Sequence, residues 1–102
     1  VRKIVRERQR LYQVLGQFPF LRVYPSRANF LLCRVLQGSA HALRAHLERA
    51  GILVRLFDKV TLPNAIRITV GTPVHTDRIV AALAAWQPQA EQAGSPLHQG
   101  LT

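Results

Sequence analysis

Residues 65–73 read Ala-Ile-Arg-Ile-Thr-Val-Gly-Thr-Pro, and this stretch decides how the chain folds. Apolar and polar side chains alternate over its first six residues, with the period of a β-strand that buries one face. Gly71 interrupts this strand, Thr72 can cap a helix, and Pro73 suits the first helical position. We therefore predict a strand over 65–70 that leads directly into a last helix.

Apolar periodicity in the rest of the sequence predicts five further elements. A leading amphipathic helix should end before Pro19, and a second helix should begin after Ser39 and end at a left-handed Gly51. A connection over 58–64 contains turn residues but is long for a hairpin. The expected elements are helix 1–18, strands 20–24 and 28–36, helix 40–50, strands 52–57 and 65–70, and a helix from 73 whose buried face reaches Trp86.

This order of elements predicts an α+β fold with two layers. Adjacent strands joined by short links favour a mainly antiparallel sheet of about four strands, with the helices covering one face. A chain of 102 residues holds one such domain, which we expect over residues 1–86. Residues 87–102 are rich in Pro, Gln, Gly and Ser, so they are predicted to form a disordered tail.

The composition is that of a globular domain, with 48% hydrophobic and 19% charged residues. The only cysteine, Cys33, lies in an apolar run and is expected to be buried and inert. One cysteine cannot form an internal disulfide, and no apolar run approaches the ~20 residues of a membrane span. The chain also begins without Met or an apolar signal segment, so we expect a cytoplasmic location and a start that is not the natural one.

The net charge of +9 raises the hypothesis of a small basic module that binds nucleic acid. The sequence disfavours it, because it has no aromatic RNA-binding strand and no paired Cys and His ligands for zinc. Binding to an oligonucleotide that weakens steeply with salt would support the hypothesis. The four histidines also lack an acidic partner at ligand spacing, so no metal site is expected. They are His41, His46, His75 and His98.

Two arginines stand inside strands that otherwise alternate. If the isoleucines of 65–70 face the helices, Arg67 points to the other side of the sheet, and the same reasoning places Arg55 there. Adjacent guanidiniums repel each other unless an anion lies near them, and rigid forked donors suit a carboxylate or a phosphate. The alternative is that each arginine lies on a solvated face or pairs with one of the five acids of the chain.

Three segments of the sequence resemble histidinol-phosphate aminotransferases. They are 25–32 (Pro-Ser-Arg-Ala-Asn-Phe-Leu-Leu), 51–55 (Gly-Ile-Leu-Val-Arg) and 65–73, in the order of that family and with similar spacing. The resemblance covers about residues 1–86 and identifies the chain as similar to the C-terminal small domain of such enzymes. These are fold type I enzymes that depend on pyridoxal 5'-phosphate, and they act as homodimers.

The resemblance implies a reaction and two site residues. The full-length enzyme would transfer an amino group between an amino acid and a 2-oxo acid, with histidinol phosphate and 2-oxoglutarate as substrates in histidine biosynthesis. Arg67 would bind the substrate's α-carboxylate, and Arg55 would bind its other anionic end or support the closed site. Asn29 would be structural, through side-chain hydrogen bonds to nearby backbone. The small domain of threonine-phosphate decarboxylase is similar, and this alternative stays open.

The sequence departs from the family's pattern in two ways. Val74, His75 and Thr76 stand where family members usually place acidic residues that complement the helix dipole. Neither Lys3 nor Lys59 lies in the context of the lysine that carries the cofactor. The cofactor is therefore expected to be bound by a large domain that precedes this one in the same chain, and the fragment alone should be inactive.

Overall fold

The computed structural model describes residues 2–88, and its elements follow the predicted order. Most of the predicted disordered tail, from residue 89 on, lies outside the described residues. The elements are α1 (Arg2–Leu15), β1 (Leu21–Val23), β2 (Phe30–Val35), α2 (Ala40–Arg49), β3 (Arg55–Lys59), β4 (Leu62–Thr69) and α3 (Pro73–Ala84).

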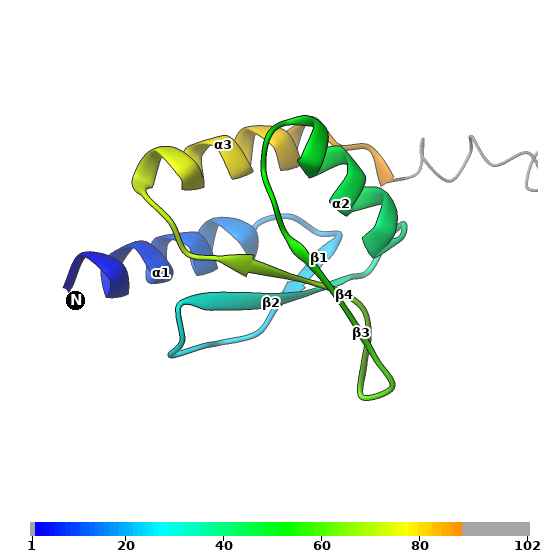
Figure 1. Cartoon of the computed structure of the whole chain (residues 1–102), viewed down its shortest axis with the longest axis horizontal. Coiled ribbons are helices and arrows are strands. Elements are labelled where there is room, and N and C mark those ends of the chain that lie inside the picture. Colours follow the sequence, from blue (N-terminus) through cyan, green and yellow to red (C-terminus); the bar gives the residue numbers. More distant parts are fainter. Residues whose placement is uncertain (1, 89–102) are drawn as a thin grey trace, which may run out of the picture.

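The four strands form one sheet in the order β1-β2-β4-β3, and all three neighbouring pairs are antiparallel. The three helices lie together on one side of this sheet (Figure 1). The predicted two-layer α+β architecture is confirmed. The other face of the sheet is not covered by any helix of the described residues, which leaves it open for a site.

The core lies between the sheet and the helices. Ile66 and Ile68 of β4 are at most 1% exposed, whereas Arg67 and Thr69 alternate with them and point to the open face. The predicted alternation in β4 is therefore confirmed. The helices cover the strands with Leu11 and Leu15 of α1, Leu43 and Leu47 of α2, and Ile79 and Leu83 of α3.

The predicted glycine at the end of α2 has the expected conformation. Gly51 has φ +81°, and its N–H donates to the carbonyl of Glu48 at 2.9 Å. The N–H of Ile52 donates to the carbonyl of Leu47 at the same distance. These two bonds are the Schellman pattern, which satisfies the last carbonyls of the helix. This turn connects α2 to the segment that leads into β3, which begins at Arg55.

The α1 helix is shorter than predicted and buries less of its apolar stripe. It ends at Leu15, because Gln17 and Phe18 donate to carbonyls three residues earlier and tighten the chain into turns. Ile4 belongs to the predicted stripe but is 54% exposed, since the first turns of α1 extend past the core (Figure 1). Trp86 lies beyond the end of α3 yet is buried as predicted.

The link between the last two strands is a hairpin, and the prediction of a long connection was wrong. β3 begins at Arg55, later than predicted, and pairs as far as Lys59 opposite Leu62. The register shifts between Phe57 and Lys59, which marks a bulge. Asn64, which was predicted to lie in the connection, is inside β4 with φ 55°.

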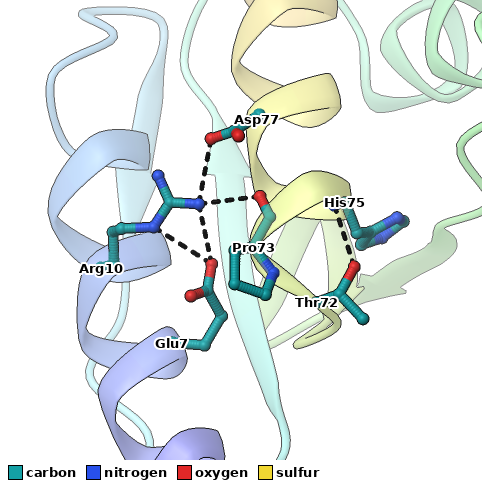
Figure 2. A network of polar contacts seen from close by, with 6 residues as sticks. All are labelled: Glu7, Arg10, Thr72, Pro73, His75 and Asp77. Carbon is teal, nitrogen blue, oxygen red and sulfur yellow. Dashed lines mark hydrogen bonds and ion pairs between the residues drawn. The ribbon is translucent and has the colours of Figure 1, made fainter.

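The start of α3 is held by Thr72 and by a contact from α1. The Thr72 hydroxyl accepts a hydrogen bond from the N–H of His75 at 3.2 Å, as expected of a cap. Arg10 of α1 lies 3.0 Å from Asp77 and donates to the carbonyl of Pro73 at 2.8 Å (Figure 2). Glu7 completes this network at 3.0 Å from Arg10. The hydrogen bonds to the carboxylates of Glu7 and Asp77 raise the pKa of the Arg10 guanidinium.

Cys33 is fully buried, and burial raises the pKa of its thiol to about 12. The unfolded thiol loses its proton near pH 9.0, whereas the folded thiol keeps it up to about pH 12. The unfolded state then binds fewer protons over this interval, so the contribution of Cys33 to stability falls as pH rises above 9.0.

We predict that Cys33 of the native protein does not react with a thiol reagent at neutral or mildly alkaline pH. Its reaction should begin only when urea unfolds the chain, because the nucleophile is the accessible thiolate. Absorbance of the released thiol reporter, followed across a urea titration, checks this. Rapid stoichiometric labelling in buffer alone would contradict it.

Candidate anion-binding site

The hairpin places Arg55 directly opposite Arg67. The two residues are Cα partners in the antiparallel pairing of β3 with β4, so their side chains leave the sheet on the same side. Since Ile66 and Ile68 occupy the face toward the helices, both arginines lie on the open face. The prediction that Arg55 and Arg67 share the face opposite the helices is confirmed.

The two arginines line a hollow of about 190 Å³ at this end of the sheet. Thr69 of β4 also lines it, together with Leu53 and Val54 of the segment that precedes β3. Leu53 is 77% exposed, which is unusual for a leucine and leaves an apolar rim beside the charged groups. The hollow therefore combines two arginines, a threonine and an apolar edge.

Neither Arg55 nor Arg67 forms an ion pair with another of residues 2–88. The Nε of Arg67 is buried and has no hydrogen-bond partner in the structure. A buried donor without a partner costs stability, and two like charges in register repel each other. This repulsion is relieved when an anion accepts hydrogen bonds from the accessible donors of the pair, so the arrangement suits a carboxylate or a phosphate.

Phe30 is a residue of the site that the sequence reasoning missed. The ring centroid of Phe30 lies 5.1 Å from the guanidinium carbon of Arg67. The strand predicted over 28–36 includes Phe30, but the prediction assigns its side chain to neither face. The alternation of β2 could have assigned it, because Leu31, Cys33 and Val35 are buried under the helices and the residues between them face the open side.

Asn29 does not make the side-chain hydrogen bonds that were predicted for it. Its side chain is exposed and has no hydrogen bond within the described part of the chain, whereas its main-chain carbonyl accepts from Val70 at 2.8 Å. The hydroxyl of Ser26 stabilises the turn instead, by accepting from the N–H of Ala28 at 2.9 Å. The predicted side-chain role is therefore wrong, although Asn29 does join β2 to the end of β4.

The two lysines of the chain lie away from the hollow that Arg55 and Arg67 line. Lys3 is exposed on α1, and Lys59 is exposed at the end of the hairpin with its Nζ 5.9 Å from the ring of Phe57. Neither lysine lines the hollow beside Arg67. Between residues 2 and 88 there is no group of three side chains able to hold a metal ion, and no helix there is long and apolar enough to cross a membrane.

Part of the basic charge near the N-terminus serves internal contacts. Arg8 donates from Nη1 to the main-chain carbonyls of Arg27 at 2.8 Å and of Ala28 at 3.2 Å. Arg10 is held by the network at the start of α3. Arg8 and Arg10 therefore connect α1 to the turn before β2 and to α3. These contacts account for part of the basic charge without a nucleic-acid partner.

Comparison with known proteins finds relatives that carry the same name, histidinol-phosphate aminotransferase. A histidinol-phosphate aminotransferase of Dehalococcoides mccartyi (strain CBDB1) is 51% identical over 83 residues, and a chloroplastic histidinol-phosphate aminotransferase of Arabidopsis thaliana is 41% identical over 81 residues. These matches cover 81% and 78% of this chain. They cover 23% and 19% of the two relatives, so the chain spans less than a quarter of their length.

Two solved structures have the same fold. The histidinol-phosphate aminotransferase from Clostridium acetobutylicum superposes with a TM-score of 0.71 at 28% identity, over 78% of this chain and 25% of that one. The L-threonine-O-3-phosphate decarboxylase from Porphyromonas gingivalis superposes with a TM-score of 0.74 at 28% identity, over 81% and 26%. The resemblance stated from the three sequence segments is confirmed. The family model for aminotransferase class I and II matches residues 1–83, and the chain belongs to this family.

Proposed function

We propose that this chain is the small domain of a histidinol-phosphate aminotransferase and supplies the arginines that bind the anionic groups of its substrates. The observation that carries the proposal is the pair Arg55 and Arg67, which share the open face of the sheet, line one hollow and have no carboxylate partner among residues 2–88. The relatives named histidinol-phosphate aminotransferase support the choice of reaction.

In this proposal the chain binds and orients the substrate. Arg67 donates a forked pair of hydrogen bonds to the α-carboxylate, and Arg55 beside it binds the second anionic end or stabilises the closed site. A dicarboxylate such as 2-oxoglutarate and a phosphate ester such as histidinol phosphate both present oxygen acceptors of the required charge. The apolar rim at Leu53 would exclude water from these pairs when the site closes.

Enzymes of this family generally depend on pyridoxal phosphate, which stabilises the negative charge that develops on the substrate carbon. Since the described lysines do not fit that cofactor, we propose that a large domain of the same chain binds it and that this domain closes over it. We further propose that the full-length protein acts as a homodimer and that it is cytoplasmic.

We predict that the 102-residue chain alone takes up no pyridoxal phosphate at a specific site. Exposed Lys3 and Lys59 lack both a phosphate cup and a partner for the ring nitrogen. After borohydride treatment, mass spectrometry should find no more cofactor on this chain than on an unrelated protein of equal lysine content. A stoichiometric adduct at Lys59 would contradict the prediction.

A decarboxylase that acts on threonine phosphate is the second candidate, because its solved relative superposes with a TM-score of 0.74. The two functions are separated by assaying the full-length protein with each substrate. Glutamate formed from histidinol phosphate and 2-oxoglutarate supports the transaminase. Carbon dioxide released from threonine phosphate, with no glutamate formed, would replace our proposal with the decarboxylase.

A further inference from the structure

Phe30 contacts the charged end of Arg67 on the open face of the sheet. Phe30 is the first residue of β2, and its partner on β4 is Thr69. Arg67 is two residues from Thr69, so it shares the face of Phe30 and is its diagonal neighbour. The guanidinium carbon of Arg67 lies 5.1 Å from the Phe30 centroid, within the distance at which a ring attracts a cation.

Core packing does not account for an aromatic ring at position 30. The residues of β2 that face the helices are Leu31, Cys33 and Val35, all buried, whereas Phe30 is half-buried on the opposite side. Within residues 2–88, the group that interacts with the Phe30 ring is the guanidinium of Arg67. The carbonyl of the preceding Asn29 accepts from the N–H of Val70 at 2.8 Å. This bond fixes the start of β2 beside the end of β4.

We propose that Phe30 is a positioning residue for Arg67, holding its guanidinium at the hollow without neutralising it. This inference rests on the proposed function of Arg67 in binding the substrate's anion. A carboxylate could also restrain Arg67, but it would occupy the N–H donors and compete with the substrate for the same charge. An aromatic ring attracts the cation through its π electrons and accepts none of the strong hydrogen bonds. The buried, unpartnered Nε of Arg67 agrees with this arrangement.

The inference is tested in the full-length enzyme by replacing Phe30 with leucine and with tyrosine. The probe is 2-oxoglutarate, and its affinity is measured by titration calorimetry. Phe30→Leu should weaken binding by about three- to thirtyfold, the range expected of a partly desolvated cation–π contact. Phe30→Tyr keeps the ring and should remain within about twofold of wild type.

Phe57→Leu is the matched control, because Phe57 lies on the same face and its ring is 5.9 Å from the Nζ of Lys59. It should leave the affinity for 2-oxoglutarate unchanged. The melting temperatures of all variants are measured, so that a loss of folding is separated from a loss of positioning. An equal loss of affinity in Phe30→Leu and Phe57→Leu would overturn the proposal.

A double-mutant cycle separates this inference from the proposed function. In an Arg67→Ala background, Phe30→Leu should change the affinity by less than about twofold, because the group it positions is absent. If Arg67→Ala weakens binding and Phe30→Leu does not, the positioning role alone is wrong. If Arg67→Ala leaves the affinity unchanged, the proposed function of Arg67 is wrong, and the role of Phe30 falls with it.

Discussion

Replacing Arg67 by alanine in the full-length enzyme is expected to lower kcat/KM by about two to four decades. Arg67 lies on the open face opposite Arg55, and within residues 2–88 it forms no ion pair that would compete with the substrate. Removing one partner of a desolvated, charge-assisted pair costs about 3–5 kcal/mol, since the substrate's anion is left buried without its counter-charge. Each 1.36 kcal/mol corresponds to about one decade in rate.

Arg67→Lys should recover only part of this loss, because an ammonium group cannot reproduce the planar fork. The melting temperature should change little in either variant, since Arg67 points away from the helices and the core. Spectral titration of the cofactor separates the roles. Cofactor affinity should stay near that of wild type, while the affinities for amino-acid and oxo-acid ligands fall.

Arg34→Ala is the matched control for Arg67→Ala. Arg34 stands on the same face of the sheet, on β2 opposite Arg22, but it does not line the hollow. The same loss of charge from the same face should therefore leave kcat/KM within about threefold of wild type if the effect of Arg67 is local. If the Arg67→Ala enzyme has a lower melting temperature but binds its substrates with normal affinity, the role of Arg67 is structural.

The architecture could be read from the sequence because local signals agree with the tertiary packing. The alternation in 65–70 assigned the two faces of β4, and Gly51 marked the end of α2 through its left-handed backbone. The same alternation placed Arg55 and Arg67 on one face. The two faces of a strand follow from the alternation of its side chains along the chain. The end of α2 follows from a backbone conformation that glycine adopts readily.

Contacts between distant segments could not be read in this way. The sequence did not indicate that Phe30 approaches Arg67, because the pairing of β2 with β4 joins residues 31 to 39 positions apart and no periodicity encodes that register. The end of the hairpin was also missed. Its turn between Lys59 and Leu62 lacks glycine, and the positive φ that accompanies the bulge belongs to Asn64.

The same limit applies to Asn64, which sequence reasoning treated as one turn residue among several. Its side chain reaches three other segments of the fold. Its Oδ1 accepts from the N–H of Ala40 at 2.7 Å, at the start of α2, and its Nδ2 donates to the carbonyls of Val35 at 2.8 Å and Gly38 at 3.2 Å. Asp58 accepts from the Asn64 N–H at 3.0 Å across the hairpin.

We predict that Asn64→Ala lowers the free energy of unfolding of the 102-residue chain by about 3–5 kcal/mol. The N–H of Ala40 and the two carbonyls lose their partner at half-buried positions, and each such group costs about 1–3 kcal/mol unless water reaches it. The alanine must also adopt φ 55°, which costs an L-residue about 1–2 kcal/mol. A domain of this size is stable by about 5–15 kcal/mol, so this loss is a large fraction of its free energy of unfolding.

Asn64→Gly separates the two causes, since glycine adopts φ 55° without strain but makes none of the side-chain bonds. It should be more stable than Asn64→Ala by about 1 kcal/mol and remain well below wild type. Asn29→Ala is the control, because that asparagine is exposed and its side chain makes no hydrogen bond with residues 2–88; its change should lie within about 0.5 kcal/mol. Urea unfolding followed by circular dichroism measures all three. Equal stability of Asn64→Ala and Asn29→Ala would show that the contacts of Asn64 do not hold the hairpin to α2.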